Sequence, residues 1–313
     1  MANITASMVK ELRERTQAGM SDCKNALVEA EGDMEKAVEI ILKKGLAKAA
    51  SRSGRVAAEG EVATWIATDG KRGVIVEVNC QTDFASRDEV FKSFVRSVMS
   101  VASKAPKGAD LGALIYPGTD KTVEYTRAEL VAKTGENMVV RRWGSLEAKE
   151  AQGLVHAYIH AGGKLAVLVH AEGADAKNPE LRGFVDNVAM QIAAMNPMVV
   201  RREEIAQAQI DKQKEIFEAQ MKEEKAAGTL KAPEAAWPKI IEGKLGKWFN
   251  EITLLGQDNV WDPPAGTIDK LRQELGKKLG GEVKIHAFVR YSLGEGIDKP
   301  PSEDFAAEVA KLT

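Results

Sequence analysis

The sequence predicts an α+β protein built from several small modules. Three observations lead to this class: capped helical segments fill residues 5–45, a β-hairpin pattern occurs twice, and a charged helical segment interrupts the second copy. A chain of 313 residues is also longer than one small hydrophobic core normally supports. We therefore expect an N-terminal three-helix bundle, duplicated antiparallel-sheet/helix core subdomains, an inserted helical hairpin arm and a C-terminal helical module.

The first 45 residues have the spacing of three short helices. Thr5 is expected to cap the first helix, Ser21 the second and Asp33 the third, because apolar residues at helical spacing follow each of them. Residues 46–59 are rich in alanine and basic residues and poor in large apolar groups. We expect a linker there, with its charges solvated.

An internal repeat organises the rest of the chain. The segment GEVATWIATDGKRGVIVEV from Gly60 matches GLVHAYIHAGGKLAVLVHA from Gly153, at an offset of 93 residues. Each copy reads as strand, glycine-containing turn and strand, which is the pattern of a β-hairpin. Further matches at an offset of 141, such as Gly135 with Gly276, predict that each copy continues with a short helix ended by glycine and a returning strand.

The change of offset places about 48 extra residues between Ile192 and Thr267. Residues 201–226 are charged with a broken apolar stripe, and a second amphipathic segment runs from Pro238 to Leu254. A helix–turn–helix arm accounts for both segments. Two interpretations of this arm remain open: a solvated hairpin within one chain, or a surface for self-association or for a partner.

The C-terminal sequence reads as a Gly/Pro linker followed by a short helix with Phe305 on its apolar face. A helix of about three turns is not stable alone in water, so it must dock on this chain or on another one. The expected domains are a three-helix domain with its basic linker (1–55), a core N-subdomain (56–145), a core C-subdomain (146–197 and 240–291), the inserted arm (198–239) and a C-terminal module (292–313).

One aromatic residue stands out between the modules. The strand-like run Val74–Val78 leads into a polar turn in which Phe84 directly follows Asp83. Burying a Phe side chain is worth ~1.5–3 kcal/mol, so Phe84 should be covered by the protein's own core or by a partner. The aligned residue of the second copy is Lys177, so the fold unit does not need an aromatic residue there. Apolar side chains usually enter their own core, so at this point a partner-binding wedge on a rigid scaffold is the alternative that stays open.

Charge and motifs exclude several classes of function. With 44 basic and 46 acidic residues, the chain does not have the charge of a protein whose whole surface clamps nucleic acid. The two cysteines fit a reducing compartment, and neither a signal peptide nor a membrane span is evident, so we expect a cytoplasmic protein. Phosphate loops, dinucleotide motifs, zinc helices and nucleophile elbows are missing, so we expect no chemical active site.

Two other functions remain as alternatives. His156 and His160 share one face of a strand-like segment, but no third ligand is evident, so we expect neither a metal nor a cofactor. Stoichiometric metal in the purified protein would instead support a metal hydrolase. Salt-sensitive RNA binding by residues 1–59 would support a ubiquitin-like or nucleic-acid-binding adaptor.

Five segments resemble the bacterial translation elongation factor Ts family, and together they span essentially the whole chain in order. The segments are LRERTQAGMSDCKNAL from Leu12, VEVNCQTDFASRD from Val76, YIHAGGKLAVLV from Tyr158, AMQIAAMNP from Ala189 and FVRYSLGEGIDK from Phe288.

The resemblance implies a guanine nucleotide exchange factor for the translational GTPase elongation factor Tu. It implies binding to Tu in its GDP-bound and nucleotide-free states, in the cytoplasm, without direct contact to nucleic acid or membrane. It also implies that the N-terminal bundle is ubiquitin-associated-like (UBA-like) and that the arm serves dimerisation. A homodimer through the arm would form a heterotetramer with Tu.

In the family, a TDFV motif helps to dislodge the Mg²⁺ that holds GDP on the partner. The resemblance assigns this role here to Thr82, Asp83, Phe84 and Ala85, with Phe84 and Asp83 as the intruding residues. Ala85 stands where the family usually has valine, and the position therefore loses apolar contact area.

The resemblance also implies partner contacts elsewhere in the chain. The family's histidine that contacts the GTPase domain of Tu corresponds to His160, and Met20 and Phe305 are further expected contacts. The pair Asp258-Asn259 departs from the family pattern, which commonly has Pro-Phe at these positions.

Overall fold

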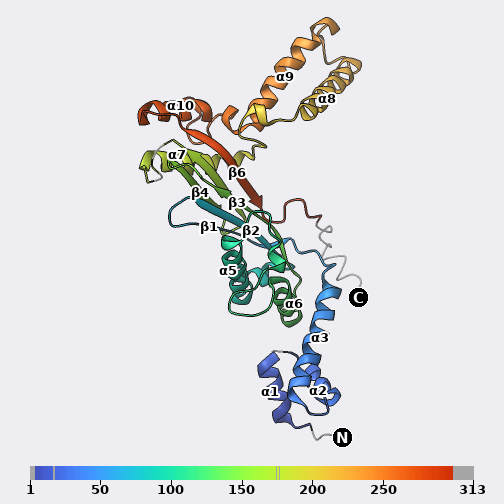
Figure 1. Cartoon of the computed structure of the whole chain (residues 1–313). Helices are drawn as coiled ribbons and strands as arrows, with labels where there is room; N and C mark the ends of the chain where they lie inside the picture. Colours follow the sequence, from blue (N-terminus) through green and yellow to red (C-terminus); the bar gives the residue numbers. More distant parts are fainter. Residues whose placement is uncertain (1–3, 17, 174, 176, 299–313) are drawn as a thin grey trace. The chain divides into compact units, whose positions relative to one another are not determined.

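The computed structural model describes residues 4–16, 18–173, 175 and 177–298. These residues form ten α-helices and two small antiparallel sheets, which confirms the predicted α+β class (Figure 1). The chain divides into two compact units. Unit 1 contains the residues up to Ala63, Val76–Gly144 and the residues from Tyr291, and unit 2 contains Thr64–Ile75 and Ser145–Arg290.

Three helices begin the chain: α1 (Ala6–Thr16), α2 (Met20–Glu29) and α3 (Met34–Arg52). Their shared core contains Leu12, Cys23, Ala26, Leu27 and Ala37, all fully buried.

The first and third predicted helix caps are confirmed. The backbone N–H of Met8 donates to Thr5 Oγ1 at 3.3 Å, and that of Lys36 donates to Asp33 Oδ1 at 3.1 Å. The predicted cap at Ser21 is wrong, because α2 already begins at Met20.

The predicted linker at 46–59 is wrong in its first half, because α3 continues to Arg52. Alanine, lysine and arginine are among the best helix formers, so the same composition that suggested a linker extends the helix.

The first sheet has the order β1-β2-β3, with β1 (Glu59–Ile66), β2 (Arg72–Cys80) and β3 (Met138–Glu147). Three helices accompany it in the sequence: α4 (Asp83–Arg87), α5 (Glu89–Lys104) and α6 (Val123–Thr134). Every residue of β2 after Arg72 is buried, and α5 buries an apolar face that includes Phe91 and Phe94. The strand that precedes Phe84 is therefore held firmly on both faces.

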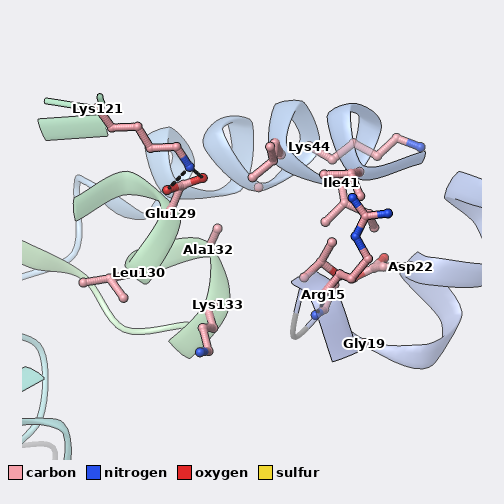
Figure 2. Close-up of a pocket in the computed structure, with 15 residues that line it drawn as sticks. Arg15, Gly19, Asp22, Ile41, Lys44, Lys121, Glu129, Leu130, Ala132 and Lys133 are labelled. Carbon is pink, nitrogen blue, oxygen red and sulfur yellow. Dashed lines mark hydrogen bonds and ion pairs between the residues drawn. The ribbon is translucent and has the colours of Figure 1, made fainter. Parts of the chain in front are cut away.

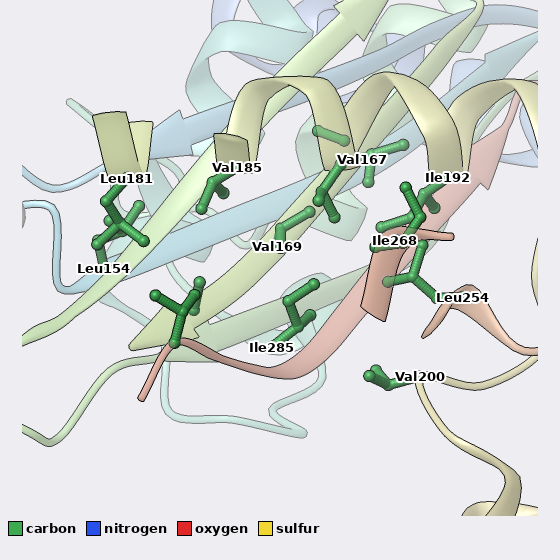
Figure 3. Close-up of a cluster of buried hydrophobic side chains, with 14 residues drawn as sticks. Leu154, Val167, Val169, Leu181, Val185, Ile192, Val200, Leu254, Ile268 and Ile285 are labelled. Carbon is green, nitrogen blue, oxygen red and sulfur yellow. The ribbon is translucent and has the colours of Figure 1, made fainter. Parts of the chain in front are cut away.

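The second sheet repeats this plan in the order β4-β5-β6, with β4 (Gly153–His160), β5 (Leu165–Glu172) and β6 (Lys284–Ser292). The antiparallel pairing of β4 with β5 runs from Gly153 opposite Glu172 to His160 opposite Leu165. The helix α7 (Pro179–Met195) packs on these two strands, and Val185 and Ile192 enter the core shown in Figure 3. Strand β6, the helix α10 (Ile268–Leu279) and the segment around Leu254 complete this core.

The second half of the repeat is shifted relative to the sequence prediction. Helices α6 and α10 begin after the capping residues Thr122 and Thr267 and end at Gly135 and Gly280, whose φ angles are 82° and 72°. The structural offset is therefore 145 residues, and the predicted helix end at Gly276 is wrong. A side chain at Gly276 would place its Cβ 2.7 Å from the carbonyl oxygen of Gly281, so close packing explains this glycine.

The inserted segment contains α8 (Gln207–Ala226) and α9 (Trp237–Ile252), which lie side by side as a hairpin (upper right in Figure 1). On α8, Met221 is fully buried, whereas Ile216 stays exposed. Within the residues described, no helix combines the length and apolar composition that a membrane span requires.

Candidate partner-binding site

The segment that carries Phe84 is a single helical turn fixed to the end of a buried strand. Strand β2 ends at Cys80, whose thiol donates to the carbonyl oxygen of Thr82 at 3.2 Å. Helix α4 follows at once, so the polar turn predicted from the sequence is helical.

Short-range hydrogen bonds account for this helical turn. Thr82 caps α4, and its Oγ1 accepts from the backbone N–H of Ala85 at 3.2 Å. The Ser86 hydroxyl donates to the carbonyl oxygen of Asp83 at 2.7 Å. The carboxylate of Asp83 pairs with Arg87 at 2.9 Å. The backbone N–H groups of Ser86 and Asp88 also donate to the carbonyl oxygens of Thr82 and Ala85. None of these interactions involves the Phe84 side chain, so the backbone of α4 is held without it.

The protein's own core does not cover Phe84. Its side chain is 79% exposed, whereas Phe91, seven residues later, is fully buried. Phe84 lies at the edge of a cavity of about 320 Å³ whose other lining residues are Ala85, Asp88, Phe91, Thr134, Glu136 and Met138. Aromatic side chains are the commonest anchors of protein interfaces, so an exposed Phe beside a cavity is available to a partner.

His160 lies in unit 2, at the exposed end of β4. Its Nδ1 is 3.0 Å from the hydroxyl of Tyr158, and the two rings lie 6.0 Å apart. His156 instead places Nε2 at 2.9 Å from Asp186 Oδ1 on α7. Each histidine therefore has a different partner, and the described part of the chain holds no group of three or more His, Cys, Asp or Glu residues suited to a metal ion.

Met20 is 49% exposed at the first position of α2. A cavity of about 460 Å³ lies among α1, α2, α3 and α6 in unit 1 (Figure 2). Lys121 reaches both oxygens of Glu129 there, at 2.7 and 2.9 Å. The lining also contains the charged side chains of Arg15, Asp22, Lys44 and Lys133. Phe305, the remaining predicted contact, lies outside the described residues.

The sequence reasoning missed a buried ionic cluster on β2, formed by Glu77, Arg141, Arg142 and Gly294 and called here the Glu77 cluster. The fully buried Glu77 accepts from Arg141 Nη1 at 2.9 Å, Arg142 Nε at 2.5 Å and the backbone N–H of Gly294 at 2.8 Å. Burial alone would raise the pKa of Glu77, but the Gly294 N–H and the two guanidiniums outweigh it and lower the pKa. The available signal was a carboxylate within an otherwise apolar strand.

Of the departing pair Asp258-Asn259, the asparagine has a structural explanation. Asn259 is buried, its Nδ2 donates to the carbonyl oxygen of Gly266 at 2.6 Å, and its Oδ1 accepts from the backbone N–H of Asp262 at 2.7 Å. Both ends of one amide thus close the loop 259–266 from inside, a function that an apolar side chain cannot perform.

Comparison with known proteins identifies the family. The family model described as Elongation factor TS matches residues 81–295. A protein named Elongation factor Ts from a Nitratiruptor species is 46% identical over 313 residues, covering 98% of each chain. Proteins of the same name from Clostridium perfringens and Syntrophotalea carbinolica are each 44% identical, covering 99% of both chains. Because these matches include the Thr82–Ala85 segment, both sheets and the inserted helices, the chain belongs to the elongation factor Ts family of translation elongation proteins.

Proposed function

We propose that this protein is a guanine nucleotide exchange factor for elongation factor Tu and that Phe84 is the wedge that opens the nucleotide site. Membership of the elongation factor Ts family supports the choice of partner. The exposure of Phe84 on a helical turn fixed by Thr82 is the observation that carries the mechanism. No bond is made or broken in nucleotide exchange, so the function requires no chemical active site.

The mechanism depends on negative coupling between two ligands of Tu. If this protein weakens the binding of GDP to Tu, GDP must weaken the binding of this protein by the same factor. Phe84 would supply the differential contact by entering the GTPase domain of Tu only when the Mg²⁺ and phosphate ligands are displaced. Mg²⁺ requires nearly ideal octahedral geometry, so a small displacement of its protein ligands weakens nucleotide binding strongly.

The neighbours of Phe84 have supporting roles in this proposal. Thr82 fixes the start of α4 through its cap, and the ion pair of Asp83 with Arg87 fixes the orientation of the same turn. In this proposal Asp83 also accepts a hydrogen bond from the displaced segment of Tu. Ala85 uses its backbone N–H for the cap, and its short side chain leaves Phe84 as the dominant apolar contact.

Stopped-flow release of fluorescent GDP from elongation factor Tu tests this proposal. The variant Phe84→Ala should lower the stimulated release rate by roughly 30-fold, because the loss of an aromatic anchor costs about 2 kcal/mol or more. The matched control is Ile115→Ala, which truncates another apolar side chain in unit 1 that is 57% exposed and should retain the wild-type rate. An unchanged rate for Phe84→Ala would remove the wedge from the mechanism.

The remaining expected contacts belong to the same proposal. We infer that Met20, His160 and Phe305 also bind Tu, in a protein that functions in the cytoplasm without contacting nucleic acid or membrane. The arm formed by α8 and α9 could pair two copies of the chain or act as a hairpin within one chain. Sedimentation of the free protein and of its complex with Tu distinguishes a homodimer, and hence a heterotetramer with Tu, from a hairpin that acts within one chain.

A further inference from the structure

The Glu77 cluster joins the start of the C-terminal segment to β2, the strand that precedes the Phe84 turn. Glu77 binds the backbone N–H of Gly294 at 2.8 Å, and Arg142 Nη2 donates to the carbonyl oxygen of Ser292 at 3.0 Å. Arg141 donates through Nη2 to the carbonyl oxygen of Glu295. Three side-chain contacts from β2 and β3 therefore hold the main chain of residues 292–295.

The fit of this segment is specific. Gly294 has a φ angle of 70°, and a Cβ at this position would lie 2.6 Å from the carbonyl oxygen of Ala58. The guanidinium of Arg142 also lies 4.3 Å from the centre of the Tyr291 ring. A glycine at 294 thus satisfies both a left-handed backbone and a close approach to the chain before β1.

The fold itself does not require a carboxylate at position 77. The equivalent position of the second copy, at an offset of 93 residues, is His170, and its sheet forms in the same order of strands. A buried carboxylate is costly unless it is paired and hydrogen-bonded, so its presence in one copy calls for a reason beyond the sheet.

We infer that Glu77 is a positioning residue for nucleotide exchange, which holds residues 292–295 against β2 and β3 and thereby fixes the position of this segment relative to Phe84. This inference rests on the proposed function. Without Glu77, the partner would have to fix residues 292–295 during binding, which weakens association. Phe84 would still act once the complex has formed. The loss of Glu77 should therefore raise KM for Tu·GDP and leave kcat unchanged.

The first experiment measures hydrogen exchange of the amide at position 294 in the free full-length protein. Glu77→Gln keeps the size of the side chain but removes its charge, and it should accelerate exchange by ~10-fold because hydrogen bonds to charged acceptors are the stronger ones. Gly294→Ala alters the donor of the same hydrogen bond and should accelerate exchange of this amide at least as much. The control is Gly296→Ala, which has a similar φ of 75° but 3.9 Å of room to the nearest atom and should retain protection. Unchanged exchange in Glu77→Gln would overturn the inference.

The second experiment measures GDP release from elongation factor Tu at varied concentrations of Tu·GDP. Glu77→Gln should raise KM by ~10-fold with kcat retained. In the double variant Glu77→Gln/Phe305→Ala, the rise in KM should be smaller than the product of the two single rises, because both changes act through the same C-terminal segment. A double variant whose rise in KM equals the product of the two single rises would overturn the inference. So would a Glu77→Gln variant in which only kcat falls. If the wild-type protein does not stimulate release at all, the proposed function fails, while the hydrogen-exchange result for the Glu77 cluster still stands.

Discussion

The two sheets place different chemistry at three equivalent positions. In the first sheet a buried carboxylate meets permanently charged guanidiniums. In the second sheet two imidazole rings stack at 4.8 Å, and one carboxylate lies 2.7 and 3.4 Å from their Nε2 atoms. One scaffold accepts both arrangements, so neither of them is needed to form the sheet. The corresponding pairs are Glu77 with His170, Asn79 with Glu172, and Arg141 with His286.

Other features are the same in both copies and mark what the fold requires. Arg127 on α6 donates to the carbonyl oxygen of Met138 at 2.7 Å, and Arg272 on α10 donates to that of Val283 at 2.6 Å. Each arginine also binds a carboxylate three residues before it. The shared arginines tie a helix to the start of the returning chain, at the first residue of β3 and at the residue before β6.

The largest difference in stability loss between the two copies should come from truncating the buried Glu77 and, in the second copy, the partly buried His170. Glu77→Ala leaves the guanidiniums of Arg141 and Arg142 without their carboxylate and should lower the free energy of unfolding by about 3 kcal/mol. His170→Ala leaves no unpaired charge and should cost only about 1 kcal/mol. Urea unfolding followed by circular dichroism measures both variants. Equal losses would show that the first sheet does not depend on its ion pairs.

The arginines that both copies share, Arg127 and Arg272, test whether the two copies are equivalent where their contacts are the same. Arg127→Ala and Arg272→Ala each remove a hydrogen bond to a strand carbonyl and a partly buried ion pair. Each variant should lower the free energy of unfolding by about 1.5 kcal/mol. The same urea titrations apply. A difference above about 1 kcal/mol between the two variants would mean that the copies are not equivalent at this position.

The two sheets should also differ, by a smaller amount, in how their contribution to stability changes with pH. Burial, followed by repulsion from His286, lowers the pKa of His170 below its ordinary value of 6.5, although Glu172 opposes this and Lys71 adds to it. The folded state therefore favours neutral His170, and its contribution to stability is lost as the pH falls below 6.5. The pKa of Glu77 is lowered from 4.5 despite burial, so its contribution is present above that pH and is lost only as the pH falls further.

Unfolding at pH values of about 7.5 and about 5.5 measures this separation. His170→Gln should reduce the loss of stability between these two values, because the group that titrates has been removed. Glu77→Gln should leave the loss unchanged, since Glu77 stays ionised in both states of the chain over this range. If Glu77→Gln reduced the loss of stability between the two pH values and His170→Gln did not, Glu77 and not His170 would be the group that titrates in this range.

The sequence predicted the fold best where neighbouring residues decide the structure. The caps at Thr5 and Asp33 depend on hydrogen bonds within three residues, and the hairpins depend on alternation and on glycine turns. Gly276 was misassigned because its reason is a close approach of Gly281, which sequence spacing does not reveal. Residues 46–52 were misassigned because alanine-rich basic sequences suit both a helix and a linker.

The candidate site also has one feature that the sequence could predict and one that it could not. The prediction that a partner and not the protein's own core covers Phe84 followed from comparing two copies of one repeat together with the resemblance of the surrounding segment to the family, and the sequence contains both. The Glu77 cluster did not follow, because its partners Arg141 and Gly294 lie 64 and 217 residues further along the chain. A charged residue inside an apolar strand indicates that such partners exist, but only the fold identifies them.

The smallest effect on stability should come from the residue with the largest proposed effect on function. Phe84→Lys gives the first copy the residue that the second copy has at Lys177. The cap of Thr82 and the pair of Asp83 with Arg87 do not involve the Phe84 side chain, which is largely exposed, so the free energy of unfolding should change by less than ~0.5 kcal/mol. Stimulated GDP release should nevertheless fall at least as far as in Phe84→Ala. A loss of stability above about 1 kcal/mol would instead place Phe84 among the residues that the first copy needs to fold, and any fall in exchange would then lose its meaning as evidence for a wedge.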